Sequence, residues 1–418
     1  YDEIISLAYN VIVIPDKTKH YFNDKDYIEL MIVDTGVNHD STAIVHIEDE
    51  TFVNQNDCKI FDRLVYLENI RVDYYAVQFS GATWHPVCYE MSEVERKKIS
   101  KKKVLSKLVA VRNAIKQIQP RYYIPSAGPA IFPHLEQYLS FGIDNIFVHQ
   151  PDIKKFLKDT NIEVICLRPG DQLHQTLHLD PIEPPNRIEL DLLKKNLSCE
   201  FYKHDDKNFD ANRLIKMIIA RLEKIKDLKF SKCPNLIFDW GDYGLTIDLN
   251  RGNVELINIK DYNWPESYMC VKASPAYFSL MANPKYRWQD IYLSLRARVR
   301  REPDIFNTFI NIFLYSDIEN IRAGFGTTLN INDERIVVVN PHNGKNYEIN
   351  RFCPHNGADL KDAKINNNGN LICPRHSWAF DLEQEGVCRT AQASLDAKEI
   401  IEATTLCESI SVRLLKNS

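Results

Sequence analysis

Two stretches near the end of the chain, "CPHNGADL" at residues 353–360 and "CPRHSWAFDL" at residues 373–382, each bring a cysteine and a histidine close together. One residue separates the cysteine from the histidine in the first stretch, and two residues separate them in the second. A proline follows each cysteine, and proline and glycine both suit tight turns. Thiolates and imidazoles are ligands for transition metals, so two loops of this kind predict one metal centre that they share.

The four candidate ligands are Cys353, His355, Cys373 and His376, and their spacing resembles the Rieske signature of a [2Fe-2S] cluster. In such a centre two thiolates hold one iron and two imidazoles hold the other, which raises the reduction potential above that of an all-cysteine cluster. A zinc site with the same ligands is the alternative, but two separate loops that both contain proline favour the cluster. The cluster passes single electrons and leaves the chemistry on a substrate to another site.

The residues around the four ligands indicate which kind of Rieske centre this is. Respiratory Rieske proteins join their two loops by a disulfide, whereas Ala358 and Arg375 stand at the corresponding positions here. The cluster therefore resembles the ferredoxin and oxygenase type, which has a lower potential. Trp378 and Phe380 are expected to shield it from water.

The composition is that of a globular protein, with 44% hydrophobic and 26% charged residues. The net charge of −5 argues against a general nucleic-acid binder. No apolar run reaches the roughly 18 residues that a membrane span needs, and no signal-peptide pattern opens the sequence. The ten cysteines mostly stand singly at irregular spacings, which favours a reducing cytoplasm over a disulfide framework.

Hydrophobic patterning divides the chain into three regions, as its length leads us to expect. Residues 1–185 predict an α/β domain, residues 186–325 an α+β extension, and residues 326–418 a small all-β Rieske domain. The proline cluster "DPIEPPN" at residues 180–186 marks the first boundary.

Individual elements follow from periodicity and from turn residues. A helix is expected over residues 92–119, where Ser92 is an N-cap candidate. The second region predicts a hairpin over residues 245–259 and helices over residues 211–226 and 287–316. The strands expected in the first region cover residues 10–15, 28–34, 41–47, 51–55 and 72–79.

Several segments, among them "FSGATWHP" at 79–86, "ICLRPGD" at 165–171 and "WQDIYLSLRARVRREPDIF" at 288–306, resemble the CMP-N-acetylneuraminate hydroxylase family. The similarity runs in order over residues 25–310. That family joins a Rieske domain to a metallo-β-lactamase-like domain of αββα type, and residues 31–58 are similar to the second half of that fold. The resemblance implies that electrons from NADH pass through a flavin reductase and cytochrome b5 to the cluster, and then to an iron that activates O2.

The resemblance also implies site residues in the first region. His39 corresponds to an isolated histidine ligand and Asp57 to the carboxylate ligand of the iron. A turn histidine and an aspartate that caps backbone groups are the alternative roles.

Substrate-pocket candidates on the matched segments are Ser80, His85, Ser126 and Arg168. Arg168 would bind an anionic group with its bidentate fork, or would tie two loops together. His85 either faces the pocket or hydrogen-bonds a loop.

Three departures from the family weaken the assignment of its metal ligands and its reaction to this chain. The Rieske domain follows the other domain instead of preceding it, the H-x-H-x-D-H motif is absent from these 418 residues, and Ala127 replaces a loop histidine. We therefore expect either that a segment on the order of 100 residues with that motif precedes Tyr1, or that the site is degenerate. The replacement at Ala127 favours one iron over two metals.

A weaker alternative for the metal is "HQTLHLD", in which His174, His178 and Asp180 could share one helix face. Isolated histidine pairs are more often solvated or hydrogen-bonded than metal-bound.

The helix over residues 92–119 also carries many cations. They would dock an acidic electron donor or a nucleotide phosphate, or they would form a solvated helix face. We favour the solvated face. These cations are Arg96, Lys97, Lys98, Lys101, Lys102, Lys103 and Lys107.

Together these patterns predict a Rieske-dependent non-haem iron monooxygenase that takes electrons from a ferredoxin- or cytochrome b5-type donor with an NAD(P)H reductase. Its other partners would be O2 and a small polar or nucleotide-sugar-like substrate, and electron transfer across the interface of a homo-oligomer is compatible with the domain order. The alternatives are a metallohydrolase with an attached redox module and an electron-transfer protein with a degenerate lactamase-like domain.

Overall fold

The fold is known from a computed structural model, whose chain divides into two compact units. Unit 1 comprises Tyr1–Asp304 and Phe309–Thr327, and unit 2 comprises Ile305–Thr308 and Thr328–Ser418. The structure describes residues 11–34, 39–81, 83–135, 146–168, 170–172, 180–201, 209–230, 233–330, 334–355, 357–375, 377–388, 391 and 393–400.

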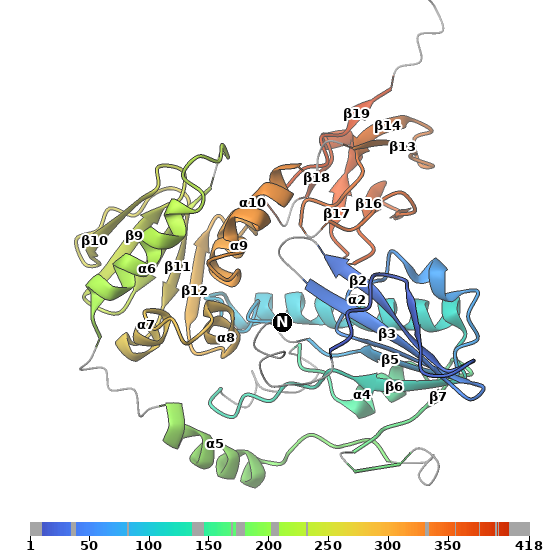
Figure 1. Ribbon diagram of the computed structural model, residues 1–418. Helices are drawn as coiled ribbons and strands as arrows, with labels where there is room; N and C mark the ends of the chain where they lie inside the picture. The colour runs from blue at the N-terminus through green and yellow to red at the C-terminus, as the bar shows by residue number, and fades with distance from the viewer. Residues whose placement is uncertain are drawn as a thin grey trace, which may run out of the picture. The chain divides into compact units, whose positions relative to one another are not determined.

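A seven-stranded sheet organises the first half of unit 1, and its strands follow one another in chain order (Figure 1). Neighbours from β1 to β4 are antiparallel, whereas β4 to β7 run parallel. The strands are β1 (Lys19–Tyr21), β2 (Tyr27–Asp34), β3 (His39–Ile47), β4 (Glu50–Asn56), β5 (Tyr74–Gln78), β6 (Tyr122–Ser126) and β7 (Glu163–Val164).

Four of the five strands expected in this region are confirmed as β2 to β5. The strand expected over residues 10–15 is wrong, because residues 11–15 form no strand and leave Ile12 and Val13 largely exposed. An apolar run becomes a strand only where a neighbouring strand completes its hydrogen-bond ladder, and here β1 pairs with β2 instead.

Helix α2 (Glu93–Ile118) covers one face of this sheet. It begins as predicted, because the Ser92 hydroxyl accepts a hydrogen bond from the backbone N–H of Glu95 at 3.2 Å. Its residues Leu108, Val111 and Ile115 are buried in one cluster with apolar side chains of β2 to β6, and η1 (Leu64–Leu67) packs on the same cluster.

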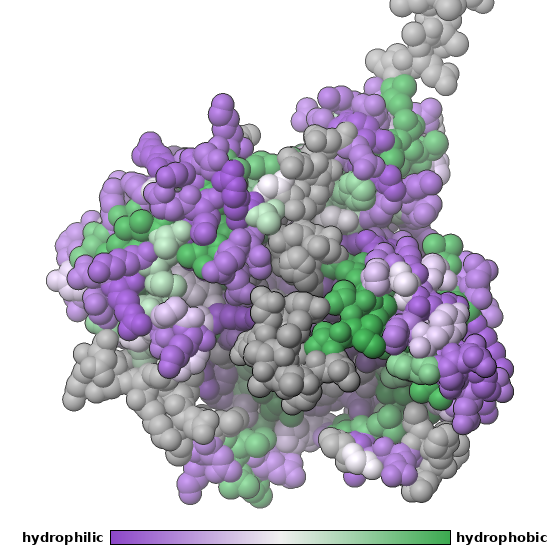
Figure 2. All heavy atoms as spheres, viewed as in Figure 1, coloured by the Kyte–Doolittle hydropathy of each residue, from purple (hydrophilic) through white to green (hydrophobic). Residues whose placement is uncertain are grey.

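The opposite face of β2 is less covered. Ile28, Leu30 and Ile32 point to this side and stay partly exposed, since side chains alternate along a strand. Figure 2 shows hydrophobic atoms at the surface over β2 and β3.

A second sheet of five strands, in the order β10-β9-β8-β11-β12, forms the other half of unit 1. Its strands are β8 (Asn235–Asp239), β9 (Tyr243–Asp248), β10 (Asn253–Asn258), β11 (Tyr268–Lys272) and β12 (Arg298–Glu302). The helices of unit 1 that accompany the two sheets are α4 (Gln150–Phe156), α5 (Arg187–Phe201), α6 (Ala211–Glu223), α7 (Pro275–Met281), α8 (Trp288–Leu293) and α9 (Thr308–Tyr315), with α10 (Ile321–Asn330) at the junction with unit 2.

The predicted hairpin is confirmed, since β9 and β10 pair in antiparallel register around Gly252. The helix expected over residues 287–316 is partly wrong, because β12 interrupts it. Val299 is fully buried there between exposed Arg298 and Arg300, and this alternation suits a strand better than a helix.

Unit 2 consists of short antiparallel strands in two small sheets, as expected of an all-β domain. One sheet has the order β13-β14-β19, with β13 (Arg335–Val339), β14 (Asn346–Asn350) and β19 (Lys398–Glu399). The other contains β15 (Lys364–Ile365), β16 (Asn370–Ile372), β17 (Ala379–Asp381) and β18 (Val387–Cys388), with η4 (Leu382–Gln384) after β17. Among all residues that the structure describes, no helix combines the length and apolarity needed to cross a bilayer.

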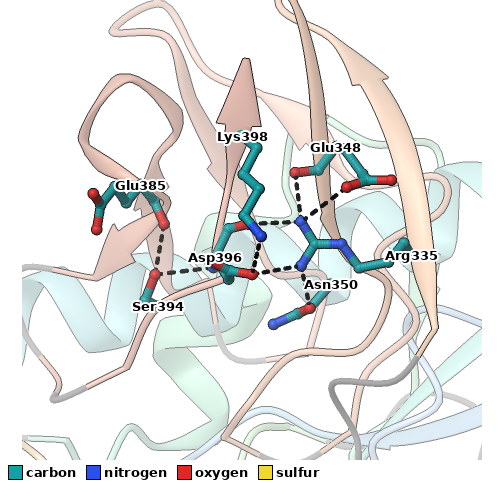
Figure 3. Close-up of polar contacts among 7 residues, drawn as sticks. All are labelled: Arg335, Glu348, Asn350, Glu385, Ser394, Asp396 and Lys398. Carbon is teal, nitrogen blue, oxygen red and sulfur yellow. Dashed lines mark hydrogen bonds and ion pairs between the residues drawn. The ribbon is translucent and has the colours of Figure 1, made fainter. Parts of the chain in front are cut away.

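Arg335 ties the first of these sheets to the segment before β19 (Figure 3). Its guanidinium donates to the Asn350 side chain at 2.6 Å and to the backbone carbonyl of Glu348 at 3.1 Å. It also donates to the carboxylate of Asp396 at 3.0 Å and to the Asp396 carbonyl at 2.8 Å. One half-buried side chain therefore satisfies acceptors on β14 and on the returning chain, where Lys398 adds an ion pair at 3.3 Å.

Replacing Arg335 by Met should weaken protection of the β13 and β14 amides by about 1–2 kcal/mol, because several hydrogen bonds to partly buried acceptors are lost together. Hydrogen exchange on the full-length protein measures this local opening. Lys398→Met is the matched control, because the exposed Lys398 ammonium contacts the same carboxylate and should contribute little. Equal effects of the two substitutions would contradict a central role for Arg335.

Candidate functional site

The first cysteine loop closes through two backbone hydrogen bonds. The N–H of Cys353 donates to the carbonyl of Ala358 at 2.9 Å, and the carbonyl of Cys353 accepts from the N–H of Gly357 at 2.9 Å. Gly357 has a φ of 61°, a left-handed conformation that glycine adopts without a steric cost. The loop thus places a left-handed residue, here glycine, four residues after its cysteine.

The second loop repeats this geometry with a different sequence. The N–H of Cys373 donates to the carbonyl of Trp378 at 2.8 Å, and the carbonyl of Cys373 accepts from the N–H of Ser377 at 2.9 Å. Ser377 stands where the first loop has glycine and is also left-handed, with a φ of 56°. Two loops of unlike sequence therefore present their cysteines on the same backbone frame.

Three of the four predicted cluster ligands are described, and all three lie in unit 2. The side chains of Cys353 and Cys373 are fully buried in one apolar cluster with residues such as Leu371 and Phe380. His355 is half-buried, and its Nδ1 atom is shielded from solvent. Two thiols and an inward imidazole nitrogen fit the donor set of a [2Fe-2S] centre with mixed ligands. His376 lies outside the described residues.

Aromatic rings cover the imidazole of His355. Trp378 stacks on it with ring centroids 4.3 Å apart and planes 8° apart. Phe306 meets His355 edge-on at 5.0 Å and Trp378 at 5.4 Å. The sequence indicated the shielding role of Trp378 but missed Phe306, since only the fold places residues 305–308 in unit 2.

An ion-pair cluster holds the ends of the first cysteine loop together. Arg351, just before the loop, donates to Asp359, just after it, at 2.7 Å and at 3.2 Å. The Arg351 guanidinium also donates to the Glu334 carboxylate at 2.9 Å. The backbone carbonyl of Arg351 accepts a hydrogen bond from the N–H of Leu360. The bidentate geometry fixes the two ends of the loop relative to each other.

In unit 1, the predicted iron and pocket residues gather at one edge of the seven-stranded sheet. Asp57 directly follows β4, and Ser126 ends β6, which runs parallel to β4 and β5. Ser80 lies two residues beyond β5. His39 begins β3, which is antiparallel to β4, so its backbone lies at the same edge, but its side chain is outside the description. Ligands of open α/β sheets bind at such carboxyl ends of strands.

Two carboxylates approach each other at this edge. Burial raises the pKa of Asp40, and the negative charge of the exposed Asp57 raises it further. A cation between the two would relieve this repulsion. In the described part of the chain, however, no group of three or more histidine, cysteine or acidic side chains is arranged to hold a metal ion.

The hydroxyls of Ser80 and Ser126 are buried and have no hydrogen-bond partner among the described residues. The two loops that carry them touch, because a Cβ atom added at Gly128 would lie 2.8 Å from the Cβ of Ser80. Ala127, between Ser126 and Gly128, adopts a left-handed φ of 49°. Unsatisfied polar groups and local strain together are typical of a ligand-binding position.

His85 is held neutral in the loop after β5. Burial, with smaller contributions from the neighbouring charges of Lys103 and Arg301, lowers its pKa to about 2. The Lys103 ammonium donates to the His85 carbonyl at 2.9 Å, and the His85 ring meets Tyr89 edge-on at 4.6 Å. Its imidazole therefore carries no positive charge at physiological pH.

The remaining candidates are not brought into this group by the described structure. Arg168 is exposed in a turn that Asp171 closes, where the backbone N–H of Arg168 donates to that carboxylate at 2.6 Å. Asp180 is exposed, and His174 and His178 lie outside the described residues.

Comparison with known proteins agrees with the geometry of unit 2. Residues 311–400 match the model of the Rieske [2Fe-2S] domain. A Mycobacterium tuberculosis protein named "Putative Rieske 2Fe-2S iron-sulfur protein" is 32% identical over 389 residues, which cover 84% of this chain and 72% of that protein. A similarly named protein of Mycolicibacterium smegmatis is 25% identical over 438 residues, covering 92% and 79%. The similarity thus extends through both units.

The loop frames predict opposite effects for two substitutions. Gly357→Val should lower the iron and acid-labile sulfide bound per chain, because a β-branched residue in the left-handed region costs about 1–2 kcal/mol or more. Ser377→Gly, the matched change in the other loop, should leave the cluster content unchanged or slow its loss in denaturant. The two expectations fail if Gly357→Val retains the cluster as long as the wild type does.

Phe306→Ala should move the reduction potential of the cluster to more positive values. Reduction adds one negative charge to the cluster, and water admitted beside His355 stabilises that charge. A spectroelectrochemical titration measures the shift, with Val339→Ala, an exposed position of the same unit, as the control. An unchanged or more negative potential would argue against a shielding role.

Proposed function

Because the chain belongs to the family of Rieske [2Fe-2S] iron-sulfur proteins, we propose that it is a Rieske-dependent non-haem iron oxygenase. Unit 2 would supply single electrons, and unit 1 would use them at an iron that activates O2. The observation that carries the proposal is the matched pair of loops that buries Cys353 and Cys373 in one cluster.

In unit 2 the thiolates of Cys353 and Cys373 would hold one iron, and the imidazoles of His355 and His376 would hold the other. When bound, this cluster supplies one-electron transfer. Trp378 stacks on a face of the His355 ring, and Phe306 meets the ring edge-on. Both side chains exclude water from the imidazole. The ion pair between Arg351 and Asp359 would hold the two ends of the first loop together.

In unit 1 we assign the iron to the sheet edge where His39 and Asp57 lie, in a metallo-β-lactamase-like fold. The approach of Asp40 to Asp57 and the gathering of Asp57, Ser80 and Ser126 at one edge support this assignment. The resemblance to CMP-N-acetylneuraminate hydroxylases supports a small polar or nucleotide-sugar-like substrate. A ferredoxin- or cytochrome b5-type donor with its NAD(P)H reductase would reduce the cluster, and a homo-oligomer would allow transfer between subunits.

A second candidate is an electron-transfer protein without iron in unit 1. The family match that supports it is confined to residues 311–400, the Rieske [2Fe-2S] domain. In that case the charged edge of unit 1 would serve binding alone, and the cluster would be the only redox centre of the chain.

Iron analysis separates these functions. The oxygenase should hold about three irons per chain, and Asp57→Asn should reduce this number to two, because a neutral amide is a much poorer iron ligand than a carboxylate. Asp49→Asn, in the turn at the far end of β3 and β4, is the control. The chemically reduced wild type should also consume O2 in a single turnover.

Two irons without O2 consumption would refute the oxygenase and leave electron transfer. Two irons together with stoichiometric zinc would instead indicate a metallohydrolase with an attached redox module.

A further inference from the structure

Two lysine side chains of unit 1 converge on one uncharged acceptor. Lys59, in the loop after β4, donates to the side-chain oxygen of Gln78 at 3.1 Å. Lys107, on α2, donates to the same oxygen atom. Neither ammonium group forms an ion pair within 4 Å with a carboxylate of the described residues, although Asp57 lies close enough to act on Lys107. Two positive charges thus meet without a neutralising group in contact.

A further cation on α2 has a different partner, since the Lys103 ammonium donates to the backbone carbonyl of His85 at 2.9 Å. Lys103 lies one helical turn before Lys107, and both side chains are half-buried, whereas Lys98 and Lys102 are exposed. Burial, with a smaller contribution from the nearby Arg301, lowers the pKa of Lys103 to about 8. The solvated helix face favoured from the sequence is therefore wrong for Lys103 and Lys107, because both side chains are half-buried and donate to acceptors in the loop after β5 and at the end of β5.

Buried hydroxyl donors flank the shared acceptor. Ser126 is the register partner of Gln78 in the parallel β5–β6 pair, so their side chains lie on the same face of the sheet. Ser80, two residues after Gln78, is fully buried. Neither hydroxyl has a hydrogen-bond partner among the described residues. Two amines therefore share one uncharged acceptor, and two buried hydroxyls beside it have none among the described residues.

Such an arrangement is costly when empty. Burial holds the pKa of Lys107 well below its ordinary value, and the Lys59 ammonium lowers it further. An oxyanion would neutralise the lysines and accept hydrogen bonds from the ammonium and hydroxyl groups at once. The carboxyl edge of parallel strands is also where α/β proteins bind their ligands.

We propose that Lys59 and Lys107, with the hydroxyls of Ser80 and Ser126, bind the oxyanion group of a small molecule, either a phosphate or a carboxylate. The site is a property of unit 1 and does not depend on iron there. The competing role for the lysines is structural, in which Gln78 merely ties α2 to the sheet. The two roles differ in how substitutions change stability and binding.

Calorimetric titration of the full-length, cluster-containing protein with inorganic phosphate and with malonate, at constant ionic strength, tests the site. Binding of phosphate alone identifies a phosphate site, and binding of malonate alone or of both identifies a carboxylate-accepting one. Lys107→Gln and Lys59→Gln should each weaken binding by roughly tenfold or more, because each removes a charge-assisted hydrogen bond. Lys102→Gln, on the exposed face of α2, should bind as the wild type does.

Thermal unfolding in buffer without these anions separates the two roles. If the lysines bind an anion, Lys107→Gln should melt at the wild-type temperature or higher, since it removes repulsion from Lys59. A lower melting temperature for both Lys107→Gln and Lys59→Gln would overturn the proposal in favour of the structural tie. Absence of binding by the wild type, or equal binding by wild type and both variants, would overturn it as well.

Discussion

The left-handed residue four positions after each cluster cysteine is the constraint on which the rest of unit 2 depends. It lets the cysteine carbonyl accept one hydrogen bond while the cysteine N–H makes another, so both loops fold back on themselves. This return buries both thiols in one apolar core and leaves the His355 imidazole under Trp378. The small strands around the loops, and the Arg335 and Arg351 clusters, serve to hold these two turns in place. The redox function of the family thus rests on a backbone conformation that glycine favours and serine tolerates.

Unit 1 is organised by a different constraint, the shared direction of β4, β5 and β6. Since these strands are parallel, the residues that follow them collect at one edge, although they are far apart in the chain. That edge holds the carboxylates of Asp40 and Asp57 together with the ammonium groups of Lys59 and Lys107. Charges of both signs act on one another there, since Lys59 lowers the pKa of Asp40 and Asp57 raises that of Lys107. The proposed metal and the proposed anionic group would each find charged partners at this edge.

Local sequence patterns predicted which segments form helices and strands better than they predicted which segments pair or pack with each other. Strands β2 to β5, the Ser92 cap and the β9–β10 hairpin were correct because alternation, capping and turn residues act over a few neighbouring positions. The strand expected at residues 10–15 failed because it lacks a partner, and the helix expected across β12 failed because its pairing with β11 decides the conformation. The expectation that the lysines of α2 are solvated was also wrong for Lys103 and Lys107, since composition cannot show that these two are half-buried.

The sequence by itself determined the chemistry of the cluster site, because the spacing of Cys353, His355, Cys373 and His376 is a local property of two short loops. Only the tertiary structure decided what surrounds those loops and what gathers elsewhere. Phe306 reaches His355, and Gln78 receives two lysines, because chain segments distant in sequence pack together. The physical reason is that turn geometry is encoded by adjacent residues, whereas burial and charge environment arise from contacts that no local pattern records.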